Sequence, residues 1–221
     1  MKKKHFAIIG MGRFGSSVAR TLYDMGFEVL AVDRSERRIQ EVLGFVTHGV
    51  SADTTDEDAL RDLNLMKYDV VVVAIGEDIQ ASILTTLILK QIGVKMTVVK
   101  ATSELHGKVL KKTGADKVVY PERDMGQRVA HHLVSANILD YIELSSEHSI
   151  VEIKATSSMI GKDLITLDIR AKYGCNVIAI KSGKGMNISP DPYEPIKDGD
   201  VLVVVGSNTD LKTFEVMNDE A

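Results

Sequence analysis

The stretch Phe6–Ser17, FAIIGMGRFGSS, decides the fold of the first half of this 221-residue chain. A short apolar run of strand type leads into Gly10, Gly12 and Gly15, and an amphipathic segment of helical period follows. This G-x-G-x-x-G spacing between a strand and a helix brings backbone N–H groups to the positive end of a helix dipole, where anions are favoured. The stretch therefore predicts a strand–loop–helix unit whose loop holds phosphate groups.

Strand-like and helix-like runs alternate on both sides of this stretch up to Pro121. The segment Val70–Ile75 is apolar at every position, which is typical of a central parallel strand buried on both faces. Five strand–helix repeats with a sixth closing strand predict an α/β doubly wound parallel sheet, a Rossmann fold, for residues 1–121.

The pattern changes after Pro121. Residues 122–142 have the spacing of one long helix, and we expect residues 122–139 to form a linker between two domains. Residues 140–221 contain alternating strand patterns, glycine- and proline-containing turns, a short helix closed by Gly174 and a terminal helix with Asn208 as its N-cap. This part is predicted to be a small α+β domain.

Composition excludes several classes of protein. The net charge of −4 disfavours a nucleic-acid partner, since such proteins carry a basic surplus. One cysteine, Cys175, rules out an intrachain disulfide and fits a reducing compartment. The longest apolar run, Val70–Ile75, is too short to cross a bilayer, so we expect a soluble protein whose membrane role requires a partner.

The glycine loop predicts a nucleotide-binding site. Gly10 permits a tight turn, Gly12 lets a pyrophosphate approach, and Gly15 lets the helix pack on the strand. Asp33 ends the second strand 18 residues later, where its carboxylate can bind ribose hydroxyls and would repel a 2′-phosphate, even with Arg34 beside it. The alternative is a Rossmann domain that has lost its ligand.

Arg13 lies between the second and third glycines. A solvated arginine is the simpler interpretation, although a cation is slightly unfavourable at a helix N-terminus. A clamp on terminal phosphate oxygens is the functional interpretation, since a guanidinium stays charged and binds two oxygens at once.

Catalytic patterns are missing from the sequence. It contains neither a G-x-S-x-G elbow nor a P-loop, and the predicted second domain, residues 140–221, has one histidine, His148. A nicotinamide enzyme needs a proton donor beside the ring, so the sequence favours a sensor over a catalyst. A small NAD-dependent oxidoreductase and a stand-alone metabolite-binding module remain as alternatives.

Longer motifs carry a specific resemblance. The stretches FAIIGMGRFG, VLAVDRS, SADTTDEDAL, VVVAIGEDIQAS, VVKATSELHGKVLKKTGADKVVYPERDMG and LDIRAKYGCNVIAIKSG follow one another along nearly the whole chain. In this order they resemble the cytosolic RCK regulatory subunits, built of TrkA-N and TrkA-C domains, of Ktr/Trk-type bacterial potassium uptake systems. One domain of each kind per chain is similar to the Ktr type.

This resemblance implies a non-catalytic gating subunit that binds ATP or ADP, and in some members NAD or NADH. It implies homodimers that assemble into an octameric ring under an integral membrane potassium-transporting subunit. Exchange of ADP for ATP would change the shape of the ring and gate the pore. The protein would then be cytoplasmic and peripheral to the inner face of the cell membrane.

The resemblance also assigns residues. The implied nucleotide-binding positions are Gly10, Met11, Gly12, Arg13, Phe14, Gly15, Asp33, Arg34, Asp53, Thr54, Ile75, Gly76, Lys100 and Glu122. Ala52 replaces a glycine found in many members, which weakens the expected close contact there. Glu122 matches a position linked to Mg²⁺ or another cation at the dimer interface, although an acid after Pro121 is also an ordinary helix start.

The second domain resembles RCK C-domains that bind cyclic di-AMP between two subunits. The implied contacts are Arg170, Ala171, Lys172, Tyr173, Asn176, Ile178 and Pro190. The structural alternative is that Arg170 and Tyr173 only close the short helix.

Overall fold

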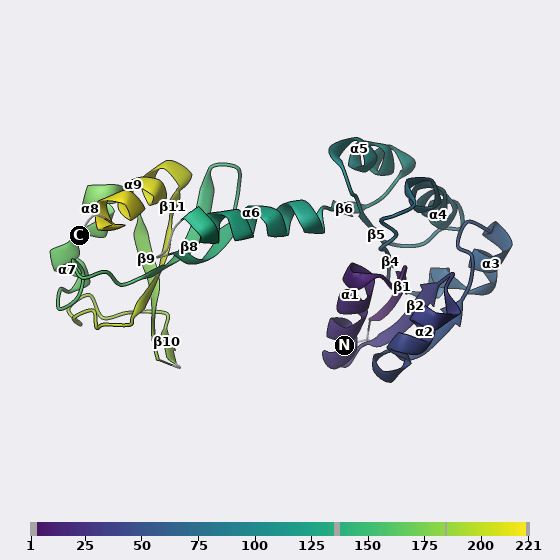
Figure 1. The fold of residues 1–221 in the computed structure, drawn as a ribbon, viewed down its shortest axis with the longest axis horizontal. Helices are drawn as coiled ribbons and strands as arrows, with labels where there is room; N and C mark the ends of the chain where they lie inside the picture. Colours follow the sequence, from purple (N-terminus) through teal and green to yellow (C-terminus); the bar gives the residue numbers. More distant parts are fainter. Residues whose placement is uncertain (1–3, 135–137, 184, 220–221) are drawn as a thin grey trace. The chain divides into compact units, whose positions relative to one another are not determined.

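A computed structural model describes residues 4–134, 138–183 and 185–219 of the chain. The chain forms two compact units (Figure 1), unit 1 up to Arg123 and unit 2 from Asp124 onward. Each unit has its own sheet and its own hydrophobic core.

Unit 1 is built on a six-stranded parallel sheet in the order β3-β2-β1-β4-β5-β6, which confirms the predicted Rossmann fold. Its strands are β1 (His5–Ile9), β2 (Glu28–Asp33), β3 (His48–Ser51), β4 (Val70–Val73), β5 (Thr97–Lys100) and β6 (Lys117–Val119). The strand order reverses between β1 and β4. In doubly wound sheets the loops after two such strands diverge, and ligands bind between them outside the carboxyl edge; this region is called the crevice.

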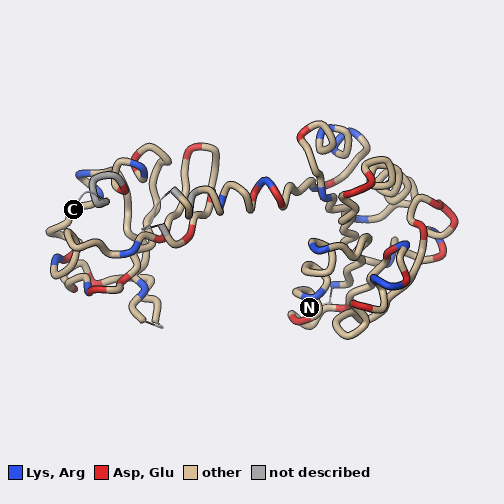
Figure 2. Tube along the Cα trace, viewed as in Figure 1, with Lys and Arg blue, Asp and Glu red and all other residues tan. Residues whose placement is uncertain are grey.

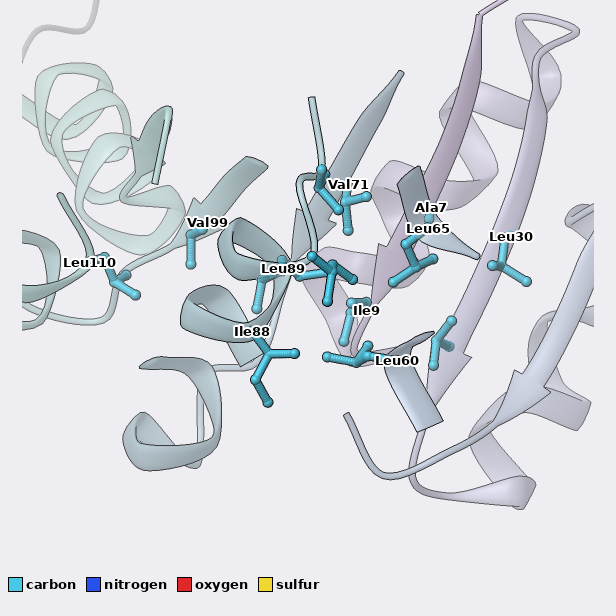
Figure 3. Close-up of a cluster of buried hydrophobic side chains, with 14 of the residues drawn as sticks. Ala7, Ile9, Leu30, Leu60, Leu65, Val71, Ile88, Leu89, Val99 and Leu110 are labelled. Atoms are coloured by element: carbon cyan, nitrogen blue, oxygen red, sulfur yellow. The ribbon is translucent and has the colours of Figure 1, made fainter. Parts of the chain in front are cut away.

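Helices cover both faces of this sheet. They are α1 (Arg13–Asp24), α2 (Glu36–Val42), α3 (Glu57–Asp62), α4 (Ile79–Gln91) and α5 (Glu104–Thr113), with 3₁₀ turns η1 (Leu43–Phe45) and η2 (Leu65–Lys67). Because strand side chains alternate, Ala7 and Ile9 join the core under α3, α4 and α5 (Figure 3), while Ile8 packs on the α1 and α2 face.

Two helix ends of unit 1 carry charges that complement the helix dipole. Glu57 and Asp58 lie in the first turn of α3, and Lys111 and Lys112 lie in the last turn of α5. These charges oppose the partial charges of the helix dipole. Acidic and basic residues are interspersed along the trace (Figure 2). This mixed distribution agrees with the modest net charge of the sequence.

Unit 2 is built on an antiparallel sheet in the order β10-β9-β11-β8-β7. Its elements are α6 (Pro121–Val134), which begins at the end of unit 1, and β7 (Ile138–Glu143), β8 (His148–Lys154), α7 (Leu164–Leu167), α8 (Ile169–Tyr173), β9 (Asn176–Ser182), β10 (Gly185–Asn187), β11 (Val201–Ser207) and α9 (Asn208–Asp219). Its core includes Ile153, Leu202 and Phe214, which are almost fully buried. The predicted α+β class is confirmed.

The long helix predicted over residues 122–142 was wrong in its second part. The helix ends at Val134, and Ile138–Glu143 forms a strand paired with β8, with Tyr141 opposite Val151. Cross-strand pairing overrides the helical spacing of this segment. Residues 135–137 of the predicted linker lie outside the described residues, and the last two positions of that linker belong to β7.

Two local predictions in unit 2 also needed correction. The short helix before Gly174 is two helices, because Asp168 adopts a left-handed conformation with φ of 47° between them. The cap of α9 is Ser207, whose hydroxyl oxygen accepts the N–H of Asp210 at 3.1 Å and whose O–H donates to the Asp210 carboxylate. The hydroxyl of Ser207 therefore caps the helix, which starts one residue earlier than predicted.

Candidate functional site at the carboxyl edge of the unit 1 sheet

The glycine loop begins where β1 and β4 lie side by side. Gly10 has a φ of +95°, and a Cβ built on it would lie 3.1 Å from the backbone carbon of Ala74. Only glycine accepts this conformation so close to a neighbouring strand. The chain therefore turns sharply away from β4 at the point where the strand order reverses.

Gly15 and Gly12 have opposite surroundings. A Cβ on Gly15 would lie 1.9 Å from the carbonyl oxygen of Gly10, so the absence of a side chain lets α1 approach the loop. A Cβ on Gly12 would meet nothing within 4 Å. Because the chain itself does not need a glycine there for packing, the open side of Gly12 fits a ligand that approaches the backbone.

The N-terminus of α1 differs from the other helix starts of unit 1. Side chains of Ser35, Asp56, Asp78 and Ser103 cap α2, α3, α4 and α5, whereas Gly12 offers no side-chain cap to α1. The first turn of α1 also lacks an acidic residue, and it starts with the exposed Arg13. First-turn N–H groups have no intrahelical acceptor, so this end of α1 is electropositive.

Asp33 connects β2 to the glycine loop. It is 5% exposed, and its Oδ2 accepts the backbone N–H of Met11 at 2.6 Å while its Oδ1 accepts that of Ser35 at 2.8 Å. Arg38 lies 3.7 Å from Oδ2. These contacts fix the loop, and the lone pairs that remain on the two oxygens are those a ribose hydroxyl would use.

Arg34 and Asp53 lie beside Asp33, at the ends of β2 and β3. Hydrogen bonds from the side chain and backbone of Thr55 lower the pKa of Asp53, and the charge of Arg34 adds to this effect. Arg34 also lies 4.0 Å from the carboxylate of Asp78. The structure thus brings a charged group of three side chains to the edge where the resemblance places ribose and adenine.

At three of the predicted positions the side chain packs against other parts of unit 1. The hydroxyl of Thr54 is buried and lies 3.0 Å from that of Thr85 on α4. Met11 is 4% exposed and packs in the core under α1, and Ile75 packs against the core on the opposite face. Any contact of Thr54 and Met11 with a ligand would come from their backbone.

Lys100 and Glu122 form an ion pair at the other end of the crevice. The ammonium Nζ of Lys100, at the end of β5, lies 2.5 Å from Oε1 of Glu122 in the first turn of α6. The same Nζ lies 3.2 Å from a Cβ built on Gly76 and 5.9 Å from the ring centroid of Phe14. The hydrogen bond from Lys100 lowers the pKa of Glu122 despite partial desolvation, and the charge of Arg13 contributes.

Sequence reasoning missed Thr102 and His106 in this region. Nδ1 of His106 accepts the backbone N–H of Thr102 at 3.3 Å, and Thr102 borders the position of Gly76. His106 is 3% exposed, burial lowers its pKa, and its Nε2 has no hydrogen-bond partner among the described residues. The available sequence signal was the spacing of three residues between the cap Ser103 and His106, which places His106 in the first turn of α5, close to Thr102.

The residues predicted for cyclic di-AMP divide into two groups. Arg170, Ala171, Asn176 and Ile178 are exposed on α8 and β9. Tyr173 instead packs edge-to-face on the buried Phe214 with a centroid distance of 5.2 Å, which places its ring in the core of unit 2.

Of the other two predicted positions, Lys172 is also exposed on α8, and only Pro190 lies elsewhere. Lys172 donates to the carbonyl of Leu167 at 2.9 Å. Pro190 lines a cavity of about 340 Å³ with Ile180, Lys197 and other residues, and the other predicted cyclic di-AMP positions are not among its lining.

The described residues contain neither a candidate metal-binding cluster nor a candidate membrane-spanning helix. No group of three or more His, Cys, Asp or Glu side chains there is arranged to hold a metal ion. None of the described helices combines the length and apolarity needed to span a membrane.

The arrangement is suited to bind an elongated anion. The uncapped end of α1, the open side of Gly12 and the cations Arg13 and Lys100 lie at one end of the crevice, and Asp33 lies beside the loop. Terminal phosphates fit the cationic end, and a ribose fits the carboxylate. The residues present therefore fit a nucleotide.

Comparison with known proteins agrees with this architecture. The TrkA-N domain model matches residues 6–121, and the TrkA-C domain model matches residues 148–217. The GsuK channel has the same fold with a TM-score of 0.69 at 19% identity over 98% of this chain, and the match spans 40% of that longer chain.

Relatives of similar length are closer in sequence. The chain is 54% identical to the Ktr system potassium uptake protein C of Bacillus subtilis, over 96% of both chains. It is 41% identical to the Ktr system potassium uptake protein A of Vibrio alginolyticus, over 94% of both chains. With both domain models and these identities, the chain belongs to the family of RCK regulatory subunits of Ktr/Trk-type bacterial potassium uptake systems, and to its Ktr type.

Proposed function

We propose that this chain is a non-catalytic subunit that binds ATP or ADP at the carboxyl edge of unit 1 and thereby controls a membrane potassium-transporting partner. NAD and NADH are further candidate ligands of the same crevice. The observation that carries the proposal is the uncapped N-terminus of α1, with two cations, Arg13 and Lys100, beside the open face of Gly12. The free N–H groups and the dipole of a helix N-terminus are sufficient to favour phosphate binding.

The nucleotide must bind two conformations unequally to act as a switch. Arg13 supplies a basis for this difference, because its guanidinium can bind two oxygens of the γ-phosphate, which ATP carries and ADP lacks. A tenfold preference of one conformation for ATP is worth about 1.4 kcal/mol per site. Several coupled sites in one assembly would multiply this bias.

The proposed assembly is a homodimer, with four dimers in an octameric ring. Met125, Val129 and Leu133 recur every fourth residue on α6 and are 54%, 49% and 81% exposed. An exposed apolar stripe of this kind favours a protein partner, and a second copy of α6 would cover it symmetrically. The ring would lie in the cytoplasm against the inner face of the membrane, where its transporting partner is embedded.

Unit 2 is proposed to bind cyclic di-AMP with the exposed residues Arg170, Asn176 and Ile178. A guanidinium and an amide are suited to phosphate and adenine edges, and the isoleucine offers apolar contact. The proposal leaves out Tyr173, whose partly buried ring packs on Phe214.

Isothermal titration of the full chain with ATP, ADP, AMP, NAD and NADH tests the nucleotide proposal. Arg13→Ala should abolish the preference for ATP over ADP and leave ADP affinity within about twofold, because only the terminal phosphate loses its cation. Arg37→Ala is the matched control, since Arg37 is 81% exposed on α2 and pairs only loosely with Glu41. The control should bind both nucleotides as the wild type does.

Three results would overturn the proposal or a part of it. If no adenosine phosphate binds, the proposed site is wrong. If ADP affinity falls as much as ATP affinity in Arg13→Ala, Arg13 is a general anchor and not a discriminator. If the purified chain oxidises NADH with a small substrate, the oxidoreductase alternative replaces the regulatory one.

A further inference from the structure

The amino edge of the unit 1 sheet, opposite the crevice, carries a row of lysines. In the sheet order β1-β4-β5-β6, each strand has a lysine at its first residue or within the three residues before it, namely Lys4, Lys67, Lys95 and Lys117. The other two strands, β2 and β3, begin with Glu28 and His48 and have no lysine at these positions. The row is therefore confined to four adjacent strands.

The end of α5 extends this row. Lys111 and Lys112 lie in its last turn, which leads through a short loop into β6 (Figure 2). All these lysines are exposed, and we call them together the lysine edge: Lys4, Lys67, Lys95, Lys111, Lys112 and Lys117. Adjacent strands lie about 4.8 Å apart, which is less than the Debye length of about 8 Å at physiological salt. Their charges therefore act together on an approaching anionic surface.

The acidic residues nearby do not neutralise the lysine edge. The carboxylate of Asp69 accepts a backbone N–H at 3.0 Å and the ammonium of Lys95 at 3.2 Å. The carboxylate of Asp116 accepts both the N–H and the O–H of Thr97, at 2.7 and 2.9 Å, and Asp62 ends α3. Apart from Lys95, the lysine edge forms no ion pair with any other residue that the structure describes. It is thus a positive surface on a chain whose net charge is −4.

Two exposed methionines lie among these lysines. Met66 directly precedes Lys67 and is 54% exposed, and Met96 directly follows Lys95 and is 38% exposed. A Cβ built on Gly93, in the loop between α4 and β5, would lie 3.9 Å from Sδ of Met66, so both methionines border the same loop. Methionine is flexible and apolar. Cations beside exposed apolar side chains are typical of protein surfaces that lie on a membrane.

We propose that the lysine edge docks on a bilayer surface that contains anionic lipid headgroups. The ammonium groups would lie at the headgroup phosphates, and Met66 and Met96 would enter the boundary between headgroups and acyl chains. The residue type favours lipid over an acidic protein segment, because carboxylates are best recognised by the two-pronged guanidinium of arginine, which residues 62–122 lack. Lysine acts as a point charge, which is sufficient for the diffuse field of a headgroup layer.

The position of the lysine edge has a consequence for the proposed function. The crevice lies at the carboxyl edge of the same sheet, so contact with lipid at the amino edge leaves it open to a nucleotide. In an assembly every copy adds its own lysine edge, and linked weak contacts multiply their affinities. The inference rests on the proposed location at the membrane but not on nucleotide binding.

Co-flotation of the full chain with protein-free vesicles tests the inference. Vesicles of phosphatidylcholine mixed with phosphatidylglycerol should bind the wild type, and vesicles of phosphatidylcholine alone should not. Binding should weaken steeply as the salt concentration rises, because salt screens exposed charges. The triple variant Lys67→Gln, Lys112→Gln and Lys117→Gln should bind the anionic vesicles about a hundredfold more weakly, since each lysine near such a surface contributes about fivefold.

A second triple variant is the matched control. Lys154→Gln, Lys162→Gln and Lys212→Gln remove the same charge from exposed positions of unit 2. This control should bind the anionic vesicles as the wild type does. Both triple variants should keep the melting temperature of the wild type, because the side chains that they change are exposed, and this measurement shows that a loss of binding is not a loss of folding.

Each contrary result overturns the inference in a different way. If the wild type does not bind anionic vesicles, or binds neutral vesicles equally well, the lysine edge does not recognise headgroups. If the control loses as much binding as the test variant, net charge rather than this edge drives the contact. If the wild type floats with native membranes but not with protein-free vesicles, the partner is an acidic segment of a membrane protein. A failure of nucleotide binding would affect only the proposed function, since the vesicles contain no nucleotide.

Discussion

The glycine loop of unit 1 and the α8–β9 stretch of unit 2 were both predicted to bind adenine-containing ligands, yet their residues are used differently. In the loop, the glycines shape the backbone and Arg13, Lys100 and Glu122 gather at one end. In α8–β9, Tyr173 enters the core while Arg170 stays exposed. A single chain thus brings the predicted loop residues together, whereas the predicted residues of α8–β9 are partly exposed and partly packed against the core.

The two regions differ in whether the backbone or the side chains determine the positions of the predicted ligand contacts. In the loop, no packing role explains the glycine at position 12, because a Cβ built there would meet nothing within 4 Å. A site made by side chains on a short helix shares those side chains with the core, as Tyr173 does. The variants below test this contrast, beginning with the largest expected effect.

Gly15→Ala should have the largest effect. Its Cβ would lie 1.9 Å from the carbonyl oxygen of Gly10, and a backbone atom between two elements cannot move away cheaply. We expect the free energy of unfolding of unit 1 to fall by about 3 kcal/mol or more. Hydrogen exchange of the β1 and β4 amides, measured on the full chain, resolves unit 1 from unit 2.

Gly12→Ala is the matched control for Gly15→Ala. Gly12 has a φ of −76°, which alanine adopts, and its Cβ would meet no atom within 4 Å. Its stability should change by less than about 1 kcal/mol, while nucleotide affinity falls because the methyl group occupies the approach to the backbone. Equal stability losses in the two variants would remove the distinction between the packing glycine and the binding glycine.

Tyr173→Ala should have the next largest effect, in unit 2. The half-buried ring packs on Phe214, which is 1% exposed, so the free energy of unfolding should fall by about 2 kcal/mol. Tyr173→Phe keeps the ring and should cost less than about 1 kcal/mol. Amide hydrogen exchange in α9 and β11 measures the change in the free energy of unfolding for both variants. An unchanged exchange rate in Tyr173→Ala would show that the ring is free to contact a ligand.

Much of the fold was predictable because it depends on short-range patterns. Apolar strands such as Val70–Val73, capping side chains such as Ser35 and the glycine spacing each specify local structure, and chain connectivity then restricts the topology. The end of α6 was not predictable in this way. Ile138–Glu143 pairs with β8, and this contact is invisible to helical periodicity.

The candidate site shows the same limit. The loop residues were found from one contiguous motif. Lys100 and Glu122, 22 residues apart, were each assigned separately from the resemblance, and their ion pair was not predicted. The contact of His106 with Thr102 escaped notice, because burial of a helix residue beneath a loop depends on how α5 packs. Sequence patterns therefore do not predict side-chain contacts that depend on how helices and strands pack together.

Arg170→Ala should have the smallest effect on stability and the most informative effect on binding. Arg170 is exposed on α8, so its removal should change the free energy of unfolding by less than about 0.5 kcal/mol. If two copies hold cyclic di-AMP through this arginine, affinity should fall at least about tenfold, because a charge-assisted bond to phosphate is lost. Lys162→Ala, an exposed cation elsewhere in unit 2, controls for net charge. Unchanged binding of cyclic di-AMP in Arg170→Ala, measured by titration of the full chain, would exclude this guanidinium as a contact and leave α8 with a structural role only.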